Sequence, residues 1–250
     1  MSGYRIRYET VAVAGVADLF IRSLLDKQQF ADPQGDAHRL GITSATWPMF
    51  GQLWPSGAHL AARLALRPVL TGEHILELGC GLGLASLVGH RRGADVTASD
   101  CHPLAGAFLL ENLRLNGLLP MKYRHGQWGA IPVADAGAAA APMAPAVNPA
   151  VAPEMVAETP LSGQFELIIG SDLLYERDAQ GDLAHYIQLH ATAVAEVWIV
   201  DPDRGNRPAF NRQMAVLGFD LQEHKLTAAS GEGGAGLLGY KGRLLQYLRH

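Results

Sequence analysis

The sequence predicts an α/β protein with a doubly wound, mostly parallel β-sheet. Short apolar segments alternate with amphipathic segments along most of the 250 residues, which is typical of repeated strand–helix units. A turn with glycines at alternate positions, 79–83, joins one predicted strand to the helix after it. Acidic residues directly follow several predicted strands, and a parallel sheet binds its ligands at that edge. We therefore expect a ligand site there.

Composition limits the size, location and partners of the protein. The chain is 48% hydrophobic and 18% charged, which is enough apolar material for a large core in one domain with extensions. The net charge is −4 and there is no basic run, so we expect no nucleic-acid partner. No segment is apolar over the roughly 18 residues that a membrane span needs, and the N-terminus lacks the apolar core of a signal peptide. We expect no membrane association.

Neither the cysteines nor the histidines indicate a metal site. Cys80 and Cys101 are the only two cysteines, too few for a disulfide framework, and we interpret them as reduced thiols of a cytoplasmic protein. The ten histidines are scattered, without the H-x-x-x-H or H-E-x-x-H spacing of zinc sites. His102 could line a pocket because it follows Asp100, although histidines are more often found at the surface or in the core.

Residues 1–50 are predicted to form an N-terminal extension in front of the core domain at 51–250. Residues 4–11 alternate in polarity as a half-exposed strand does, and residues 19–21 are a second strand candidate. Residues 28–41 are polar and contain proline and glycine, so we expect a loop.

An aromatic segment, 46–54, leads into the first helix of the core. Ser56 or Gly57 is expected to cap this helix, because both residue types are favoured at helix N-termini. Leu60 and Leu64 are one helical turn apart and should form its buried stripe.

The remaining elements of the core alternate along the chain. Strands are predicted from short apolar runs bounded by turn residues, and helices from apolar residues that repeat every three to four positions. The predicted strands are 74–78, 94–99, 121–124, 165–170, 196–200, 219–226 and 244–248, and the predicted helices are 84–92, 104–115, 182–193 and 206–217. The last two strands are joined without a helix, so one of them should run antiparallel to its neighbours.

Residues 134–160 break this pattern. They are dominated by Ala, Pro and Val, with almost no charge and no sustained period. Repeated prolines exclude a regular helix. We interpret the segment as a flexible, low-complexity insert in the core domain, and a lid over the active site is one role it could have.

The glycine turn is the first candidate binding feature. Gly79, Gly81 and Gly83 connect the strand at 74–78 to a helix, which exposes backbone N–H groups and lets a ligand approach the backbone. The spacing G-x-G-x-G differs from the G-x-G-x-x-G of dinucleotide sites. Glu77, at the strand end, suits a ligand with an amino group or a positive charge and opposes a pyrophosphate. A tight turn without a ligand could have the same spacing.

Two further residues at strand ends fit a nucleoside. Asp100 follows the second core strand, about 20 residues after the glycine turn, where a carboxylate can accept hydrogen bonds from both hydroxyls of a ribose. NAD would satisfy Asp100 equally well, and this residue could also cap the next helix. Trp128 follows the third strand, where its indole could stack on an adenine or simply pack.

The segment after the strand at 165–170 carries the candidate catalytic residues, Asp172 and Tyr175. Asp172 could orient an incoming amine and stabilise its positive charge, or it could only cap the loop. Tyr175 could shape the pocket or accept a hydrogen bond. The D-x-x-Y spacing is similar to that of the amino methylases of DNA and RNA, but those enzymes have two prolines where this chain has Leu-Leu. The rigid clamp for a flipped base is therefore missing.

Taken in order, these motifs resemble the class I, seven-β-strand methyltransferases that use S-adenosylmethionine (SAM). More closely, the set resembles their protein-lysine methyltransferase-like group and its bacterial relatives, which are often labelled predicted nicotinamide N-methylases. The likeness spans roughly residues 50–217, and the ordered set is far more specific than any one motif. The matching segments are W-P-S-G at 54–57, E-L-G-C-G-L-G at 77–83, Asp100, Trp128-Gly129 and F-E-L-I-I-G-S-D-L-L-Y at 165–175.

This resemblance implies a seven-stranded, Rossmann-like methyltransferase fold with SAM as the cofactor. By that likeness Asp172 and Tyr175 lie beside the substrate as catalytic residues. The residues implied to bind SAM are Trp54, Glu77, Gly79, Gly81, Gly83, Asp100, Trp128 and Ser171. The insert and the N-terminal extension depart from the family pattern, and both could border the substrate site, so they leave the substrate class open.

The implied reaction is displacement of the methyl group from the SAM sulfonium by a nucleophilic nitrogen. A lysine-type protein side chain is the first expectation for the acceptor, and a small-molecule amine or pyridine is the alternative. A SAM-binding module without turnover is a second class of function, which intact Asp172 and Tyr175 disfavour. An NAD-dependent dehydrogenase is a third, disfavoured by the glycine spacing and by Glu77.

Overall fold

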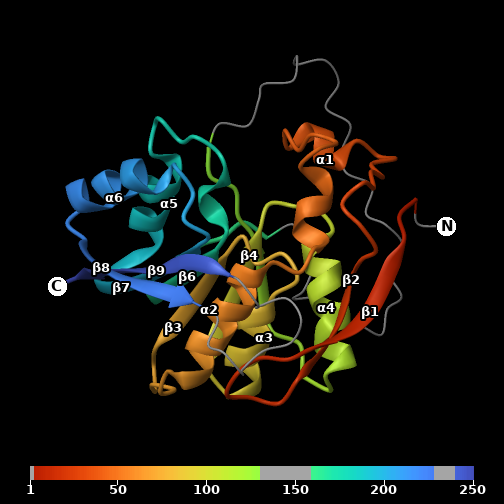
Figure 1. Ribbon diagram of the computed structural model, residues 1–250, viewed down its shortest axis with the longest axis horizontal. Helices are drawn as coiled ribbons and strands as arrows, with labels where there is room; N and C mark the ends of the chain where they lie inside the picture. Colours follow the sequence, from red (N-terminus) through yellow and green to blue (C-terminus); the bar gives the residue numbers. More distant parts are fainter. Residues whose placement is uncertain (1–2, 130–158, 228–239) are drawn as a thin grey trace.

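The computed structural model describes residues 3–129, 159–227 and 240–250. Its centre is a seven-stranded sheet in the order β5-β4-β3-β6-β7-β9-β8, beside a two-stranded hairpin, β1-β2 (Figure 1). The sheet strands are β3 (His74–Leu78), β4 (Asp95–Asp100), β5 (Lys122–His125), β6 (Phe165–Ser171), β7 (Ala191–Asp201), β8 (Asp220–Thr227) and β9 (Lys241–Arg249). This is the predicted Rossmann-like methyltransferase fold.

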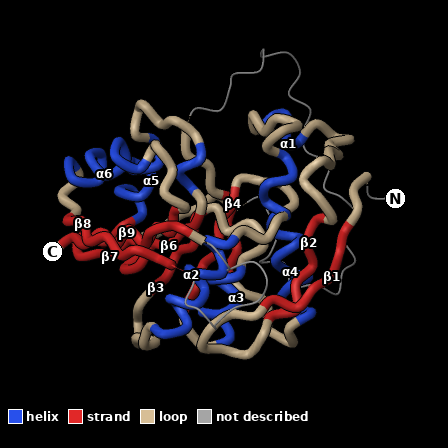
Figure 2. The backbone as a smooth tube through the Cα atoms, viewed as in Figure 1, coloured by secondary structure: helices blue, strands red, loops and turns tan. Residues whose placement is uncertain are grey.

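Strands β3 to β7 are parallel, and β9 runs antiparallel to both β7 and β8. The predicted reversal at the end of the sheet is therefore confirmed. The larger helices are α2 (Pro55–Leu66), α3 (Leu84–Arg91), α4 (Ala105–Leu115), α5 (Asp182–His190) and α6 (Arg207–Val216). Figure 2 shows the strands side by side with helices around them.

The core lies in two layers, one on each face of the sheet. Ile75 packs with the layer that contains α2, α3 and α4, and the next residue, Leu76, packs with the layer that contains α5 and α6. Ile168 and Ile169 divide in the same way. Because side chains alternate along a strand, near-continuous apolar strands are what a sheet covered on both faces requires.

The N-terminal hairpin consists of β1 (Ile6–Val11) and β2 (Leu19–Leu24). Ile21 is fully buried in the same layer as α2 and α4. The backbone N–H of Arg22 donates to Asn112 Oδ1 at 2.8 Å, and that of Phe20 to Asn116 Oδ1 at 3.0 Å. The hairpin is thus fastened to α4 by side-chain amides as well as by apolar contacts.

Several sequence-based boundaries were wrong; β9, for example, begins at Lys241 rather than at 244. Helix α2 begins at Pro55 with Trp54 as its N-cap, because proline suits the first helical position. Ser56 does not cap it, and its hydroxyl instead bonds Tyr240 Oη at 2.9 Å. Helix α5 ends at His190 rather than at 193, since Ala191 already pairs with Phe165 as the start of β7. The predicted loop at 28–41 contains one helical turn, α1 (Asp36–Arg39).

Most of the insert predicted at 134–160 lies outside the described residues, as do residues 228–239, between β8 and β9. The end of the insert is described. His125 donates its backbone N–H to Thr159 O at 3.0 Å and accepts one from Leu161 at 2.9 Å. The chain therefore leaves the insert beside the end of β5.

Candidate functional site

The glycine turn between β3 and α3 is shaped by close packing. Gly81 has φ 52°, and a Cβ there would lie 2.8 Å from the carbonyl oxygen of Phe50. Gly83 is the N-cap of α3, and its Cβ would lie 2.5 Å from Leu109 Cδ1. A side chain at either position would collide with its neighbour and strain the backbone.

Asp100, at the end of β4, closes the glycine turn. Its Oδ2 accepts the backbone N–H of Gly81 and its Oδ1 that of His102, both at 2.8 Å. Burial raises the pKa of Asp100, and these hydrogen bonds oppose the shift. Each carboxylate oxygen has two lone pairs, so both can still accept a ligand hydroxyl.

Glu77 lies one strand away, near the end of β3, and is 3% exposed. Its Oε2 accepts the backbone N–H of Ser86 at 2.7 Å and also the Ser86 hydroxyl. Burial raises the pKa of Glu77 to about 7, the Ser86 hydrogen bonds lower it, and the charge of Asp100 raises it further. A cation bound beside Glu77 would favour its ionised form.

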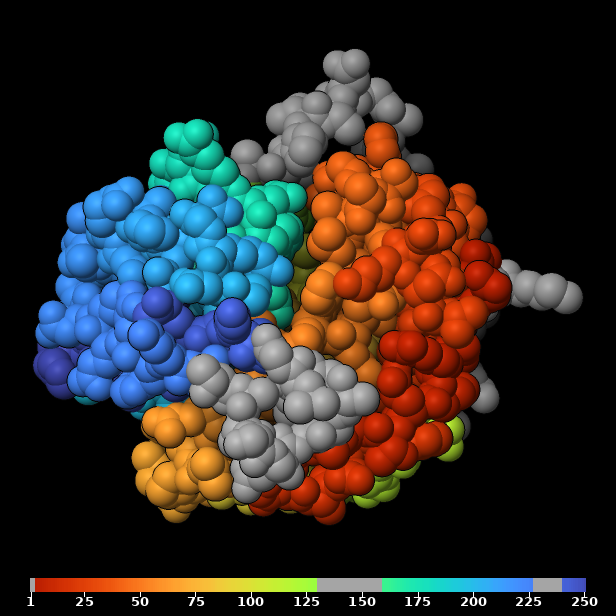
Figure 3. Space-filling view, viewed as in Figure 1, coloured from red at the N-terminus to blue at the C-terminus, as the bar shows by residue number. Residues whose placement is uncertain are grey.

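Glu77 and Asp100 line the same cavity, which has a volume of about 650 Å³. Its opening lies between residues 40–57 on one side and the loops after β6 and β7 on the other (Figure 3). The predicted site residues that line it are Trp54, Glu77, Gly79, Gly81, Asp100, Trp128, Ser171, Asp172 and Tyr175. Gly83 does not line the cavity; it contributes to the packing of α3.

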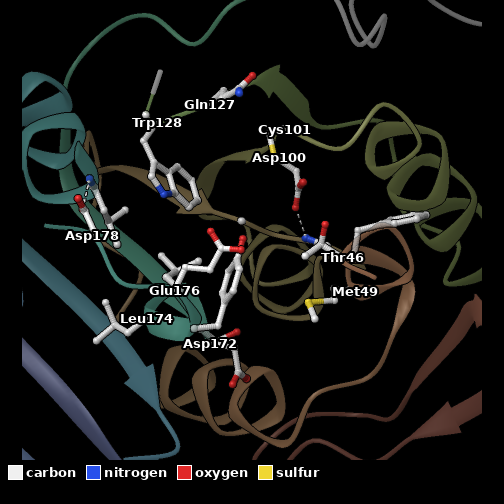
Figure 4. Close-up of a pocket in the computed structure, with 18 of the residues that line it drawn as sticks. Thr46, Met49, Asp100, Cys101, Gln127, Trp128, Asp172, Leu174, Glu176 and Asp178 are labelled. Atoms are coloured by element: carbon white, nitrogen blue, oxygen red, sulfur yellow. Dashed lines mark hydrogen bonds between the residues drawn. The ribbon is translucent and has the colours of Figure 1, made fainter. Parts of the chain in front are cut away.

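Two tryptophans form part of the cavity wall. The indole of Trp128 projects into the cavity (Figure 4) and lies 6.1 Å from the ring of Tyr186. Trp54 donates its indole N–H to Met49 O at 3.0 Å, and Lys27 Nζ lies 4.2 Å from its ring centroid. The indole of Trp54 therefore already attracts a cation.

Asp172 occupies a strained position directly after β6. Its φ of 59° is in the left-handed region, and its backbone N–H donates to Val200 O at 2.9 Å. Arg204 Nη1 donates to Asp172 Oδ1 at 2.6 Å, while Oδ2 is buried without a hydrogen-bond partner in the described part of the chain. Tyr175 follows in the turn η3 (Leu173–Tyr175), and partial burial raises its pKa.

Arg204 and Asn206 also line the cavity, and sequence reasoning did not select them. Asn206 donates its side-chain N–H to Leu174 O at 3.0 Å. Both residues belong to the loop after β7, where the only sequence signal was the acidic strand end at Asp201. Asp172 and Leu174, to which they donate these hydrogen bonds, are each 32 positions earlier in the chain, so no local pattern links the two loops.

Cys80, Cys101 and His102 line the cavity without an evident chemical role. Burial raises the pKa of both thiols, which keeps them protonated and weakly nucleophilic. His102 stacks on Phe50 with 3.7 Å between ring centroids. Burial lowers the pKa of His102 to about 3, so its ring is neutral.

Within residues 3–129, 159–227 and 240–250, no group of three or more His, Cys, Asp or Glu side chains could hold a metal ion. Across the same stretches, every helix is too short or too polar to cross a membrane.

No family model matches the chain. Its curated relatives are lysine methyltransferases of the electron transfer flavoprotein beta subunit. The Mus musculus protein is 28% identical over 160 residues, covering 63% of this chain and 51% of that one. The Rattus norvegicus protein is 25% identical over 193 residues, covering 76% and 64%. The chain thus spans about half to two thirds of the length of these relatives.

Solved structures agree on the fold. Magnesium protoporphyrin IX methyltransferase from Synechocystis PCC 6803, with bound SAM, superposes with a TM-score of 0.52 at 12% identity, over 89% of this chain and 87% of that one. A methyltransferase from Pyrococcus furiosus gives 0.50 at 13%, over 88% and 99%. The chain has the Rossmann-like fold of the class I methyltransferases. Its resemblance to their protein-lysine methyltransferase-like group is confirmed by relatives that are named as lysine methyltransferases of a protein subunit.

Proposed function

We propose that this protein is a SAM-dependent methyltransferase that transfers a methyl group to a lysine-type nitrogen of another protein. One observation carries the proposal. Glu77 and Asp100, from neighbouring strands, line one cavity with the glycine turn between them, and Asp172 and Tyr175 line the same cavity. The names of the curated relatives support the choice of lysine.

The residues present fit SAM. A cavity of about 650 Å³ is within the size range of cofactor sites. Glu77 would hold the amino group of the methionine part, and Asp100 the ribose hydroxyls, for which its oxygens have free lone pairs. Trp128 offers an indole face for the adenine. A Cβ at Gly79 would lie 2.6 Å from Leu173 Cδ2 and one at Gly81 would lie 2.8 Å from Phe50 O, so neither position accepts a side chain without displacing a neighbour at the cavity wall.

When bound, SAM supplies a methyl group already activated on a sulfonium. This chain would contribute position and electrostatics. The acceptor nitrogen must be neutral, because a protonated amine has no lone pair. Asp172 would hold the acceptor near the methyl group, and Tyr175 would wall the pocket. The proton can leave the amine to water before capture, so no side chain is assigned as a general base.

A cytoplasmic location is part of the same proposal, supported by the free thiols of Cys80 and Cys101.

The test is transfer of tritiated methyl from SAM into a lysate that is then separated into protein and small-molecule fractions. Purified electron transfer flavoprotein beta subunit is a defined acceptor to include, because the relatives are named for it. Label in protein, strongly reduced but still measurable in an Asp172→Asn variant, supports the proposal. Label only in the small-molecule fraction contradicts the acceptor class.

Binding measurements separate the remaining alternatives. Isothermal titration should detect SAM binding and no NADH binding. SAM binding without transfer to any acceptor would indicate a binding module. NADH binding in place of SAM would indicate a dehydrogenase.

A further inference from the structure

The loop that follows β7 contacts the loop that carries Asp172 through an ion pair. Arg204 Nη1 lies 2.6 Å from Asp172 Oδ1 and 3.7 Å from Asp201 Oδ2. We propose that Arg204 is a positioning residue for methyl transfer, which holds Asp172 and the following turn in the shape that faces the acceptor. This inference rests on the proposed function.

Arg204 is itself held firmly. Its backbone N–H donates to Asp201 Oδ1 at 2.7 Å, and the Asp201 side chain is completely buried at the end of β7. A guanidinium between two carboxylates is a charge-assisted contact with a fixed direction. The rigid end of β7 therefore sets where the Arg204 guanidinium lies, and Arg204 sets where the Asp172 carboxylate lies.

The backbone conformation of Asp172 requires stabilising contacts of this kind. Its φ of 59° is a conformation that a non-glycine residue keeps only when its surroundings impose it. The backbone N–H of Asp172 is bonded to Val200 on β7, and Asn206 donates to the carbonyl of Leu174. Both ends of the 172–174 turn are thus fixed by the β7 side, and Arg204 is the contact that fixes the carboxylate.

Arg207 provides a matched control. It follows closely in the chain and is similarly shielded, with 18% side-chain exposure against 29% for Arg204. Its partners are Asp203 at 2.8 Å and Glu223 at 3.5 Å, and it is not among the residues that line the cavity. Replacing Arg207 removes a paired arginine from the same region without touching Asp172.

The experiment is a double-mutant cycle on the full chain, with Arg204→Gln, Asp172→Asn and the double variant assayed for methyl transfer. We expect Arg204→Gln to lower kcat about tenfold or more, and to cost less than about threefold when Asp172 is already Asn. Arg204→Lys should recover part of the loss, and Arg207→Gln should stay within about twofold of the wild type. SAM affinity, measured by titration calorimetry, should be unchanged in every Arg204 variant.

Additive losses would overturn the inference, because they would show that Arg204 acts independently of Asp172. A lower acceptor KM with unchanged kcat in Arg204→Gln would overturn it too, and would make Arg204 a competing cation. If Arg204→Gln does not fold, the cycle is run with Arg204→Lys and additivity is again the contradicting result. A wild type inactive on every acceptor overturns the proposed function and this inference together, whereas an active wild type with an unaffected Arg204→Gln overturns the inference alone.

Discussion

Asp100 accepts the backbone N–H of Gly81 at 2.8 Å, so the end of β4 holds the glycine turn that follows β3. The residue expected to bind the ribose is therefore also a structural part of the backbone cradle. Its second oxygen accepts the N–H of His102, at the start of the next loop. Ligand binding and the shape of the turn are coupled through one carboxylate.

Replacing Asp100 tests this coupling. Asp100→Ala removes the ribose acceptor and leaves two backbone N–H groups without partners, so we expect SAM affinity to fall at least about a hundredfold and stability to fall by about 2 kcal/mol. Calorimetric titration and urea unfolding measure the two effects. Unchanged SAM affinity would remove Asp100 from the cofactor site.

Glu77 should make stability depend on pH. Its pKa is raised from 4.5 to about 7 in the folded protein, so the folded state binds more protons than the unfolded state between these values. Its contribution is complete below about pH 4.5 and is lost as pH rises through about 7, a change of about 3 kcal/mol.

Glu77→Gln should flatten this dependence, because it removes the titrating group and leaves the other carboxylates in place. Urea unfolding of both proteins at pH 5 and pH 7.5 measures the difference. SAM should restore wild-type stability at the higher pH, since its ammonium favours ionised Glu77. Parallel pH profiles for the two proteins would contradict the assignment.

Substitutions at two glycines can distinguish the cost of backbone strain from the cost of a steric clash. Gly81 and Gly93 both have positive φ, but a Cβ at Gly93 meets nothing within 4 Å, whereas one at Gly81 meets Phe50 O at 2.8 Å. We expect Gly93→Ala to cost about 1 kcal/mol and Gly81→Ala about 3 kcal/mol. Only the Gly81 variant should also weaken SAM binding. Equal stability losses in thermal unfolding would show that the contact with Phe50 contributes nothing.

Asn112 tests the attachment of the N-terminal hairpin. It is fully buried, accepts the N–H of Arg22 at 2.8 Å and donates to Leu82 O at 3.2 Å. Asn112→Ala should destabilise the protein by about 2 to 3 kcal/mol, because it leaves buried backbone groups unpaired. Hydrogen exchange should show faster exchange at Arg22. A loss below about 0.5 kcal/mol would mean that apolar packing alone holds the hairpin.

The fold could be predicted where local signals agree with the tertiary structure. The strand at 74–78 was predicted with its observed bounds. Its apolar run ends at Gly79, where the glycine turn begins, and that change in sequence marks the end of the strand. The end of α5 could not be predicted in the same way. Residues 191–193 are compatible with a helix, and their pairing as β7, with Ala191 opposite Phe165, depends on a strand about 25 residues earlier.

The residues of the candidate site also differ in whether the sequence could predict them. Residues at strand ends, such as Glu77 and Asp100, could be selected because parallel strands bring their ends to one edge. Arg204 could not be selected, because it reaches the site only through the folding of the loop after β7 against the loop that carries Asp172. Ser86 was also missed, although its contact with Glu77 decides which oxygen of that carboxylate remains for a ligand.

The most direct test of the account is a crystal structure of the protein grown with SAM. We predict the SAM amino group within about 3 Å of a Glu77 oxygen and the ribose hydroxyls at the same distance from Asp100, with the methyl group facing the turn that begins at Asp172. Density for SAM at any other place on the protein, with the space between Glu77 and Asp100 left to water, would contradict the account.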